Sequence, residues 1–150
     1  IRSWLSEQGI EESRDSLIEG GRELRRRGGA GILAEMLLES LNGEDAVIDS
    51  IRTPGEVEAL RKRSDFVLIE IRAGLDSRWK RSQDRGRIGD PTEKERFLAQ
   101  EKAEEVASDD AGQALNATAA LSDLVIINEG GIEELYSDLE DLWPTLTKLA

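Results

Sequence analysis

Three short apolar segments, separated by longer stretches of helical character, most constrain the fold of this chain. They are Ala46–Ile48, Phe66–Ile71 and Leu124–Ile127. Their nearly continuous apolar character is typical of parallel strands covered on both faces. Strands that alternate with helices predict an α/β fold with a parallel sheet and right-handed crossovers. The 150 residues show no internal repeat and no linker, so we expect a single domain, although three strands are few for a complete sheet.

The helical stretches are marked by apolar periodicity and by end signals. We expect helices over residues 1–8, 14–27, 30–41, 54–63, 75–85, 92–106, 114–121 and 132–149. The sequence Thr53-Pro54-Gly55-Glu56 predicts a helix start with a capping box, and Thr92 with Glu95 predicts a second one. The apolar stripe of the last helix indicates packing on the core, and Pro144 is expected to kink or end that helix.

Composition excludes several classes of function. The chain has no Cys and no His, which excludes disulfides, thiol catalysis, His-based triads and metal sites built on these residues. The formal net charge of −12 argues against partners such as nucleic acid or an anionic membrane. No apolar run reaches the ~20 residues of a membrane span, which excludes a transmembrane function. The composition leaves the cytosol or the nucleus, of which we expect a cytoplasmic location. Because Met36 is the only Met and the chain begins at Ile1, we expect a piece of a longer translated product.

Arginine is concentrated in two segments of this acidic chain. Residues 22–27 and 72–87 together hold half of the 20 Lys and Arg residues. Guanidinium groups form planar, two-pronged hydrogen bonds to phosphate, so the clustering predicts a pocket for a small anion. The alternative interpretation is two solvated, Arg-rich helix faces.

Four stretches of the chain resemble P-loop nucleoside monophosphate kinases, especially the branch near dephospho-CoA kinase and adenylate kinase. They are SLIEGGRELRRRGGAGILAEMLL, AVIDSIRTPGEVEAL, FVLIEIRAGLDSRWKRSQDRGRIGDP and ALSDLVIINEGGIEEL. They follow one another in the order of the family and cover nearly the whole chain. The resemblance implies a three-layer, parallel-sheet P-loop kinase-like fold with a lid region over about residues 75–106.

The phosphate loop of the family, GxxxxGK[ST], is missing, since none of the five Lys residues follows a Gly. The resemblance therefore implies that residues 1–150 are a partial domain, whose N-terminal segment holds the first strand, the phosphate loop, the first helix and the second strand. The first strand of this fold lies between the third and the fourth. Residues 46–48 and 66–71 should then not pair with each other.

The resemblance assigns binding of the acceptor and its phosphate to five residues. Arg2 occupies the place of an Arg that follows the second strand, and Arg22 and Arg25 share a helix face that could contact the acceptor. Asp49 ends the predicted third strand, where it would hold magnesium through water or orient the acceptor, and Arg52 follows in the turn. The alternatives are a surface role for Arg2 and a structural, buried Asp49–Arg52 pair.

The resemblance assigns five further residues to the ATP side of the site. Arg81, Arg85 and Arg87 would close over the phosphates as lid arginines and spread the charge of the transferring phosphoryl group. Asn128 and Gly130 match the turn that lies against the adenine base. The chain itself offers no direct metal ligand set.

Three functions follow as alternatives. The first is a nucleotide or nucleoside monophosphate kinase that uses ATP and Mg²⁺ on a small-molecule nucleotide, with residues 1–150 inactive alone because they lack the phosphate loop. The second is a regulatory, nucleotide-binding kinase-like domain fused ahead of a deoxycytidylate deaminase, whose zinc chemistry needs the His and Cys missing here. The third is an α/β interaction domain without a nucleotide site, which titration of the parent protein with ATP and magnesium would distinguish.

Overall fold

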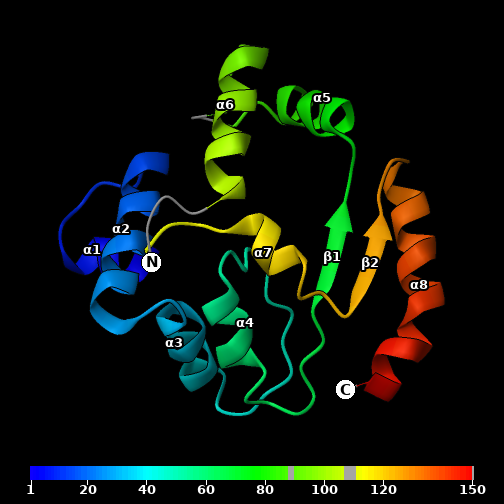
Figure 1. The fold of residues 1–150 in the computed structure, drawn as a ribbon, viewed down its shortest axis with the longest axis horizontal. Helices are drawn as coiled ribbons and strands as arrows, with labels where there is room; N and C mark the ends of the chain where they lie inside the picture. Colours follow the sequence, from blue (N-terminus) through cyan, green and yellow to red (C-terminus); the bar gives the residue numbers. More distant parts are fainter. Residues whose placement is uncertain (88–89, 107–110, 150) are drawn as a thin grey trace.

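The computed structural model describes residues 1–87, 90–106 and 111–149 and combines eight helices with two strands in these ranges. The elements are α1 (Arg2–Glu7), α2 (Arg14–Gly28), α3 (Ile32–Leu41), α4 (Pro54–Leu60), β1 (Ile69–Arg72), α5 (Leu75–Arg85), α6 (Lys94–Glu105), α7 (Leu115–Ala119), β2 (Leu124–Ile127) and α8 (Ile132–Leu149). In Figure 1, α2 and α3 lie at one side of the molecule and α8 at the other, while α5 and α6 lie beyond the carboxyl ends of the strands.

β1 and β2 form a small parallel sheet. Ile69 lies opposite Leu124 and Arg72 opposite Ile127. The predicted strand over residues 124–127 is confirmed, whereas β1 begins three residues later than the sequence indicates. The sheet shows the predicted parallel pairing, and the three-layer P-loop kinase-like fold stays a prediction.

The predicted strand Ala46–Ile48 is wrong for this structure. Its backbone is not assigned to a strand, and Val47 is fully exposed. A strand needs a neighbour for its N–H and C=O groups, and within the described ranges β1 pairs with β2 alone. The expectation that residues 46–48 do not pair with residues 66–71 therefore holds.

Side-chain caps mark the start of two helices, α2 at Ser13 and α4 at Thr53. The Thr53 hydroxyl accepts a hydrogen bond from the Glu56 amide and Glu56 reciprocates, so the predicted capping box of α4 is confirmed. The box predicted at Thr92 is wrong, because α6 takes Glu93 as its N-cap and Glu95 then lies one position too early to complete it. α8 continues through Pro144 and ends at Leu149, so Pro144 does not end the helix.

The best-packed core lies between α3 and α4. Ala34, Ala59 and Leu60 are buried together, and a ring of partly buried side chains packs on them: Leu38, Ile48, Ile51 and Phe66. Two glycines let the helix starts approach closely, since a Cβ on Gly31 would lie 2.6 Å from the carbonyl oxygen of Gly55. This packing fixes the residues just before α4, including Arg52, relative to α3.

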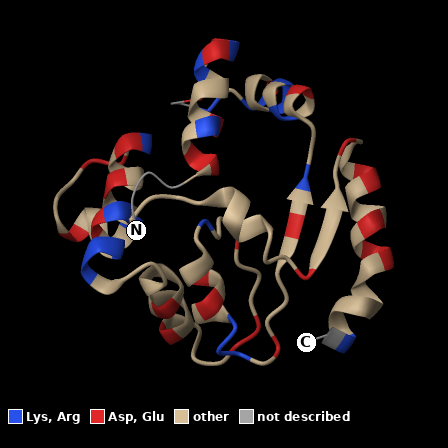
Figure 2. Ribbon diagram, in the orientation of Figure 1, with Lys and Arg blue, Asp and Glu red and all other residues tan. Residues whose placement is uncertain are grey.

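The other end of the molecule leaves apolar surface exposed. On the two strands and α8, the exposed large apolar side chains are Ile71, Val125, Ile127, Ile132, Tyr136 and Trp143. Figure 2 shows that acidic residues recur along α8, whereas basic residues gather at the C-terminal end of α2. The sheet and α8 therefore expose apolar side chains of the kind that are usually buried in a core.

Candidate functional site

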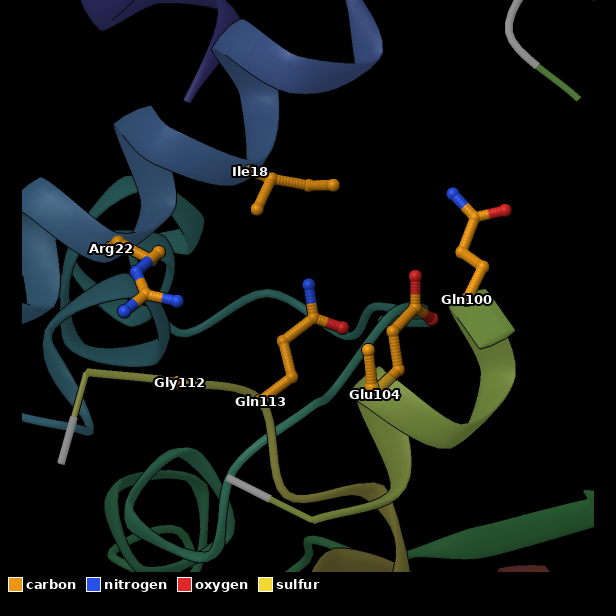
Figure 3. Close-up of a pocket in the computed structure, with 7 residues that line it drawn as sticks. Ile18, Arg22, Gln100, Glu104, Gly112 and Gln113 are labelled. Atoms are coloured by element: carbon orange, nitrogen blue, oxygen red, sulfur yellow. The ribbon is translucent and has the colours of Figure 1, made fainter. Parts of the chain in front are cut away.

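Two adjoining cavities lie between α2 and α6. The first, of about 170 Å³, has Ile18 and Arg22 of α2 on one side and Glu104 and Gln113 on the other (Figure 3). The second, of about 140 Å³, extends toward the C-terminal end of α5, and its lining includes Arg14, Arg85 and Asp90. Gln100 and Glu104 line both cavities. The two hollows therefore form one polar, arginine-bearing region.

Asp90 and Glu104 join arginines from different elements across this region. Asp90 accepts a two-pronged pair of hydrogen bonds from Arg85, at 2.9 and 3.0 Å, and lies 3.6 Å from Nη1 of Arg14. Glu104 accepts from Nη2 of Arg14 at 3.1 Å and lies 3.5 Å from Nη1 of Arg52. The end of α5, the start of α2 and the turn before α4 are thus connected through two carboxylates.

Of the predicted acceptor-binding residues, Arg22 lines the first cavity, and Arg52 contacts a residue of its lining. Nη1 of Arg52 donates to Oε1 of Gln113 at 2.9 Å, which holds that amide at the cavity wall. Arg22 lies on the opposite wall, with Nε 3.9 Å from Glu19 on the same helix. The structure therefore places Arg22 in the lining of the cavity and Arg52 behind the lining residues Gln113 and Glu104, although the two arginines lie 30 residues apart in sequence.

Arg25 is buried behind the cavities. Only 5% of it is exposed, its Nε donates to the Ala111 carbonyl at 2.8 Å, and its Nη1 lies 3.6 Å from Glu56. Glu56 also accepts from the backbone N–H groups of Arg52 and Thr53. Burial raises the pKa of Glu56, although these hydrogen bonds and the Arg25 charge oppose the rise. The contacts of Arg25 hold α2 against the start of α4.

Arg2 and Asp49 lie on the surface. Nε of Arg2 donates to Glu12 at 2.9 Å; this hydrogen bond raises the pKa of Arg2, and Asp49 adds a smaller attraction. The alternative of a buried Asp49 is wrong, because Asp49 is exposed on the unpaired segment after residue 48. Ser50, the next residue, turns the chain with a φ of 64°. The two predicted acceptor residues are thus electrostatic neighbours outside both cavities.

Arg81 brings the predicted lid into contact with the predicted adenine turn. Its guanidinium donates to the carbonyls of Asn128 and Gly130, each at 2.8 Å, and to the Asn128 side chain at 3.3 Å. Arg87, in contrast, is exposed, and its backbone N–H donates to Asp90 at 3.2 Å. Of the three predicted lid arginines, Arg81 lies at the β2–α8 turn and Arg85 at the second cavity.

Glu129 ties the same turn to the start of α5. It accepts hydrogen bonds from the Gly74 N–H and the Ser77 hydroxyl. These bonds, with the nearby charges of Arg81 and Arg78, lower the pKa of Glu129. Because the N-cap of α5 is a glycine without a capping side chain, Glu129 supplies the missing acceptor.

Sequence reasoning missed four residues of this site: Arg14, Asp90, Glu104 and Gln113. Arg14 had one available signal, since a cation in the first turn of a helix opposes the helix dipole and needs another explanation. Within residues 1–87, 90–106 and 111–149 there is no cluster of three or more His, Cys, Asp or Glu able to ligate a metal ion. In the same ranges no helix combines the length and the apolar content of a membrane span.

Comparison with known proteins gives relatives of unassigned activity. No family model and no solved structure matches the chain. A UPF0200 protein of Hyperthermus butylicus is 29% identical over 98% of this chain and 77% of its own length. A UPF0200 protein of Staphylothermus marinus is 31% identical over 81% of this chain and 62% of its own length. The chain also covers 46% of a UPF0200/UPF0201 protein of Archaeoglobus fulgidus at 26% identity. Its homologues are therefore UPF0200 family proteins, which are 25–31% identical to it.

Proposed function

We propose that residues 1–150 form the acceptor-binding and lid part of a cytoplasmic, P-loop nucleoside monophosphate kinase-like phosphotransferase. The observation that carries the proposal is the convergence of arginines from three separate segments: Arg22 and Arg85 line two adjoining cavities, and Arg52 contacts Glu104, which lines both. Phosphoryl transfer needs little from a protein beyond positioning and stabilisation of charge, and arginines from several segments supply both. In the proposal, ATP supplies the phosphoryl group and Mg²⁺ neutralises its developing charge.

The contact of Arg81 supports the place proposed for ATP. Arg81 orients the carbonyls of Asn128 and Gly130, so that the turn after β2 is held against α5. In the proposal the adenine base lies against this turn and Arg85 faces the phosphates. A lid helix bonded to the base-binding turn would couple occupancy of the ATP site to the position of α5.

The uncovered surface supports the fold proposed for the complete protein. Residues 46–48 are unpaired, and Ile71, Val125 and Ile127 are exposed on the strands. We propose that a further strand lies between residues 46–48 and β1 and carries the phosphate loop at its carboxyl end, with helices on both faces of the sheet. Such a strand would pair the backbone of both neighbours, and the helices would bury the apolar face.

A second candidate function is a regulatory domain that binds a nucleotide without transferring its phosphate, such as one fused to a deoxycytidylate deaminase. The ion pairs of the cavities favour it, because Arg85 is engaged by Asp90 and Arg52 lies near Glu104. Arginines neutralised within the chain stabilise a transferring phosphoryl group less well than free ones.

Steady-state kinetics of phosphoryl transfer test the proposal. They are measured on the protein encoded by the complete reading frame, which is called the complete protein from here on. With ATP and Mg²⁺ we expect phosphoryl transfer to a nucleoside monophosphate, measured in a coupled assay for ADP. Arg52→Ala should raise KM for the acceptor by about 10- to 100-fold, as expected for a lost charged hydrogen bond.

Arg26→Ala is the matched control, since Arg26 is a half-exposed arginine of α2 that pairs with Glu19 and Glu23 outside the cavities. It should leave KM unchanged. Nucleotide binding without transfer would favour the regulatory domain. A complete lack of nucleotide binding at millimolar concentration would contradict both candidates.

A further inference from the structure

Glu104 lies where two arginines from different elements meet. Its Oε1 accepts from Arg14 of α2 at 3.1 Å, and its Oε2 is 3.5 Å from Nη1 of Arg52 in the turn before α4. The Glu104 side chain is 21% exposed and lines both cavities. A tethered carboxylate therefore occupies the point at which two guanidinium groups could hold a free anion.

Asp90 repeats this arrangement one cavity further along. It lies between Arg85, at 2.9 Å, and Arg14, at 3.6 Å, and its side chain is 8% exposed. Arg14 is thus shared by the two carboxylates. Three arginines, Arg14, Arg52 and Arg85, surround Asp90 and Glu104, so that the local charge is close to balance and an added anion must compete with a carboxylate already in place.

The position of Arg14 is not explained by the stability of its own helix. It is the first residue of α2, where a positive charge opposes the helix dipole, and Ser13 already caps the helix. It instead donates a hydrogen bond to Glu104 and forms an ion pair with Asp90, both more than 70 residues away in the sequence. Arg14 therefore belongs to the cavities rather than to the cap of α2.

We propose that Arg14 is a phosphate-binding residue and that Glu104 is an exchangeable carboxylate. In the absence of ligand Glu104 binds the Arg14 guanidinium, and the ligand phosphate displaces it. The inference rests on the proposed function, since the ligand is the phosphate group of the acceptor nucleotide. A phosphate group carries more negative charge than a carboxylate and presents three acceptor oxygens, so it can replace Glu104 between Arg14 and Arg52. The exchange breaks the bond from α6 to α2 and couples acceptor binding to movement of α6.

Calorimetric titration of the complete protein with inorganic phosphate and with AMP, GMP, CMP and UMP tests the exchange. Glu104→Gln removes the competing charge but keeps the size of the side chain. It should tighten binding of the nucleotide that the wild type binds by about tenfold, the value of one charged hydrogen bond. Arg14→Gln should weaken the same binding by a similar factor.

Glu105→Gln is the matched control, because Glu105 is exposed at the end of the same helix and lines neither cavity. It should leave the affinity unchanged, and Glu104→Asp should behave like the wild type if the charge alone competes. Unchanged or weaker binding by Glu104→Gln, in a variant whose thermal unfolding stays cooperative, overturns the exchange. If the exchange is overturned in this way but the complete protein still transfers a phosphoryl group, the proposed function stands without the exchange. Tighter binding by Glu104→Gln without any transfer supports the exchange and contradicts the kinase instead.

Discussion

At the scale of single residues, burial decides what each arginine of this chain does. Arg25 is buried with Glu56, whereas Arg26 and Arg27, its neighbours in sequence, reach half-exposed glutamates of their own helix. An exposed ion pair is worth little, because water screens it and two long side chains lose freedom. Removal of one partner from a buried pair is costly, since the other charge stays in a poorly solvated site.

Substitution of Arg25 should therefore destabilise the protein strongly. Arg25→Ala leaves the Glu56 carboxylate buried and removes the donor to the Ala111 carbonyl. We expect a loss of about 3–5 kcal/mol in the free energy of unfolding, measured by urea denaturation at pH 7. Arg26→Ala should change it by less than about 0.5 kcal/mol, as is usual for exposed positions.

A double variant separates the buried charge from lost packing. Arg25→Met with Glu56→Gln removes both charges, keeps most of the side-chain volume and should recover part of the stability lost by Arg25→Met alone. Equal destabilisation by Arg25→Ala and Arg26→Ala would show that the Arg25–Glu56 contact contributes no more than a surface pair.

At the scale of elements, contacts between loops position the helices that carry the candidate site. α5 starts at a glycine, and its first turn is held by Glu129, which comes from the turn between β2 and α8. Arg81, on α5, in turn donates hydrogen bonds to the carbonyls of Asn128 and Gly130 in that same turn. Hydrogen bonds donated in both directions, two to Glu129 and three from Arg81, therefore fix α5, with Arg85 at its end, relative to the turn after β2.

The lowered pKa of Glu129 makes this contact sensitive to acid. Since the pKa in the folded state lies below the ordinary value of 4.5, the folded protein holds the proton less tightly than the unfolded chain. The stabilisation is fully present above pH 4.5 and is lost as the pH falls through the folded-state pKa. We expect Glu129→Gln to be less stable than wild type at pH 7, with the difference shrinking below pH 4.5 in urea denaturation.

Glu140→Gln, an exposed substitution in the middle of α8, is the control and should show no difference that shrinks in this way. A constant gap between wild type and Glu129→Gln from pH 7 to pH 3.5 would contradict the role of the Glu129 charge, leaving at most a role for the shape of the side chain.

Local signals were sufficient to predict most elements. The helix 75–85 and the strand 124–127 occur with the predicted bounds, because caps, glycines and apolar periodicity act within a few residues. The segment 46–48 failed for the opposite reason. Its apolar character is local, but a strand exists only with a paired neighbour, which the described ranges do not provide.

At the scale of the whole molecule, the candidate site depends on pairings that no local pattern reveals. Charge clustering pointed to Arg22 and Arg85, which line the cavities, and the family resemblance pointed to Arg52, which contacts Glu104 in their lining. Their partners could not be predicted, because Arg14 and Glu104 lie 90 residues apart and are brought together only by the packing of α2 near α6. One Glu among the four of the polar helix α6 carries no signal of its own.

The proposed completion of the sheet makes a prediction about amide hydrogen exchange in the complete protein. If a further strand lies between residues 46–48 and β1, the amides of residues 46–48 bond to it and exchange at least about tenfold more slowly than those of an unpaired loop. Residues 11 and 12, which are exposed and lie outside helices and strands, serve as the loop reference, and β2 serves as the paired one. Mass spectrometry of peptic peptides measures all three segments in one sample. Exchange of residues 46–48 as fast as that of residues 11 and 12 would contradict the inserted strand, and with it the proposed place of the phosphate loop.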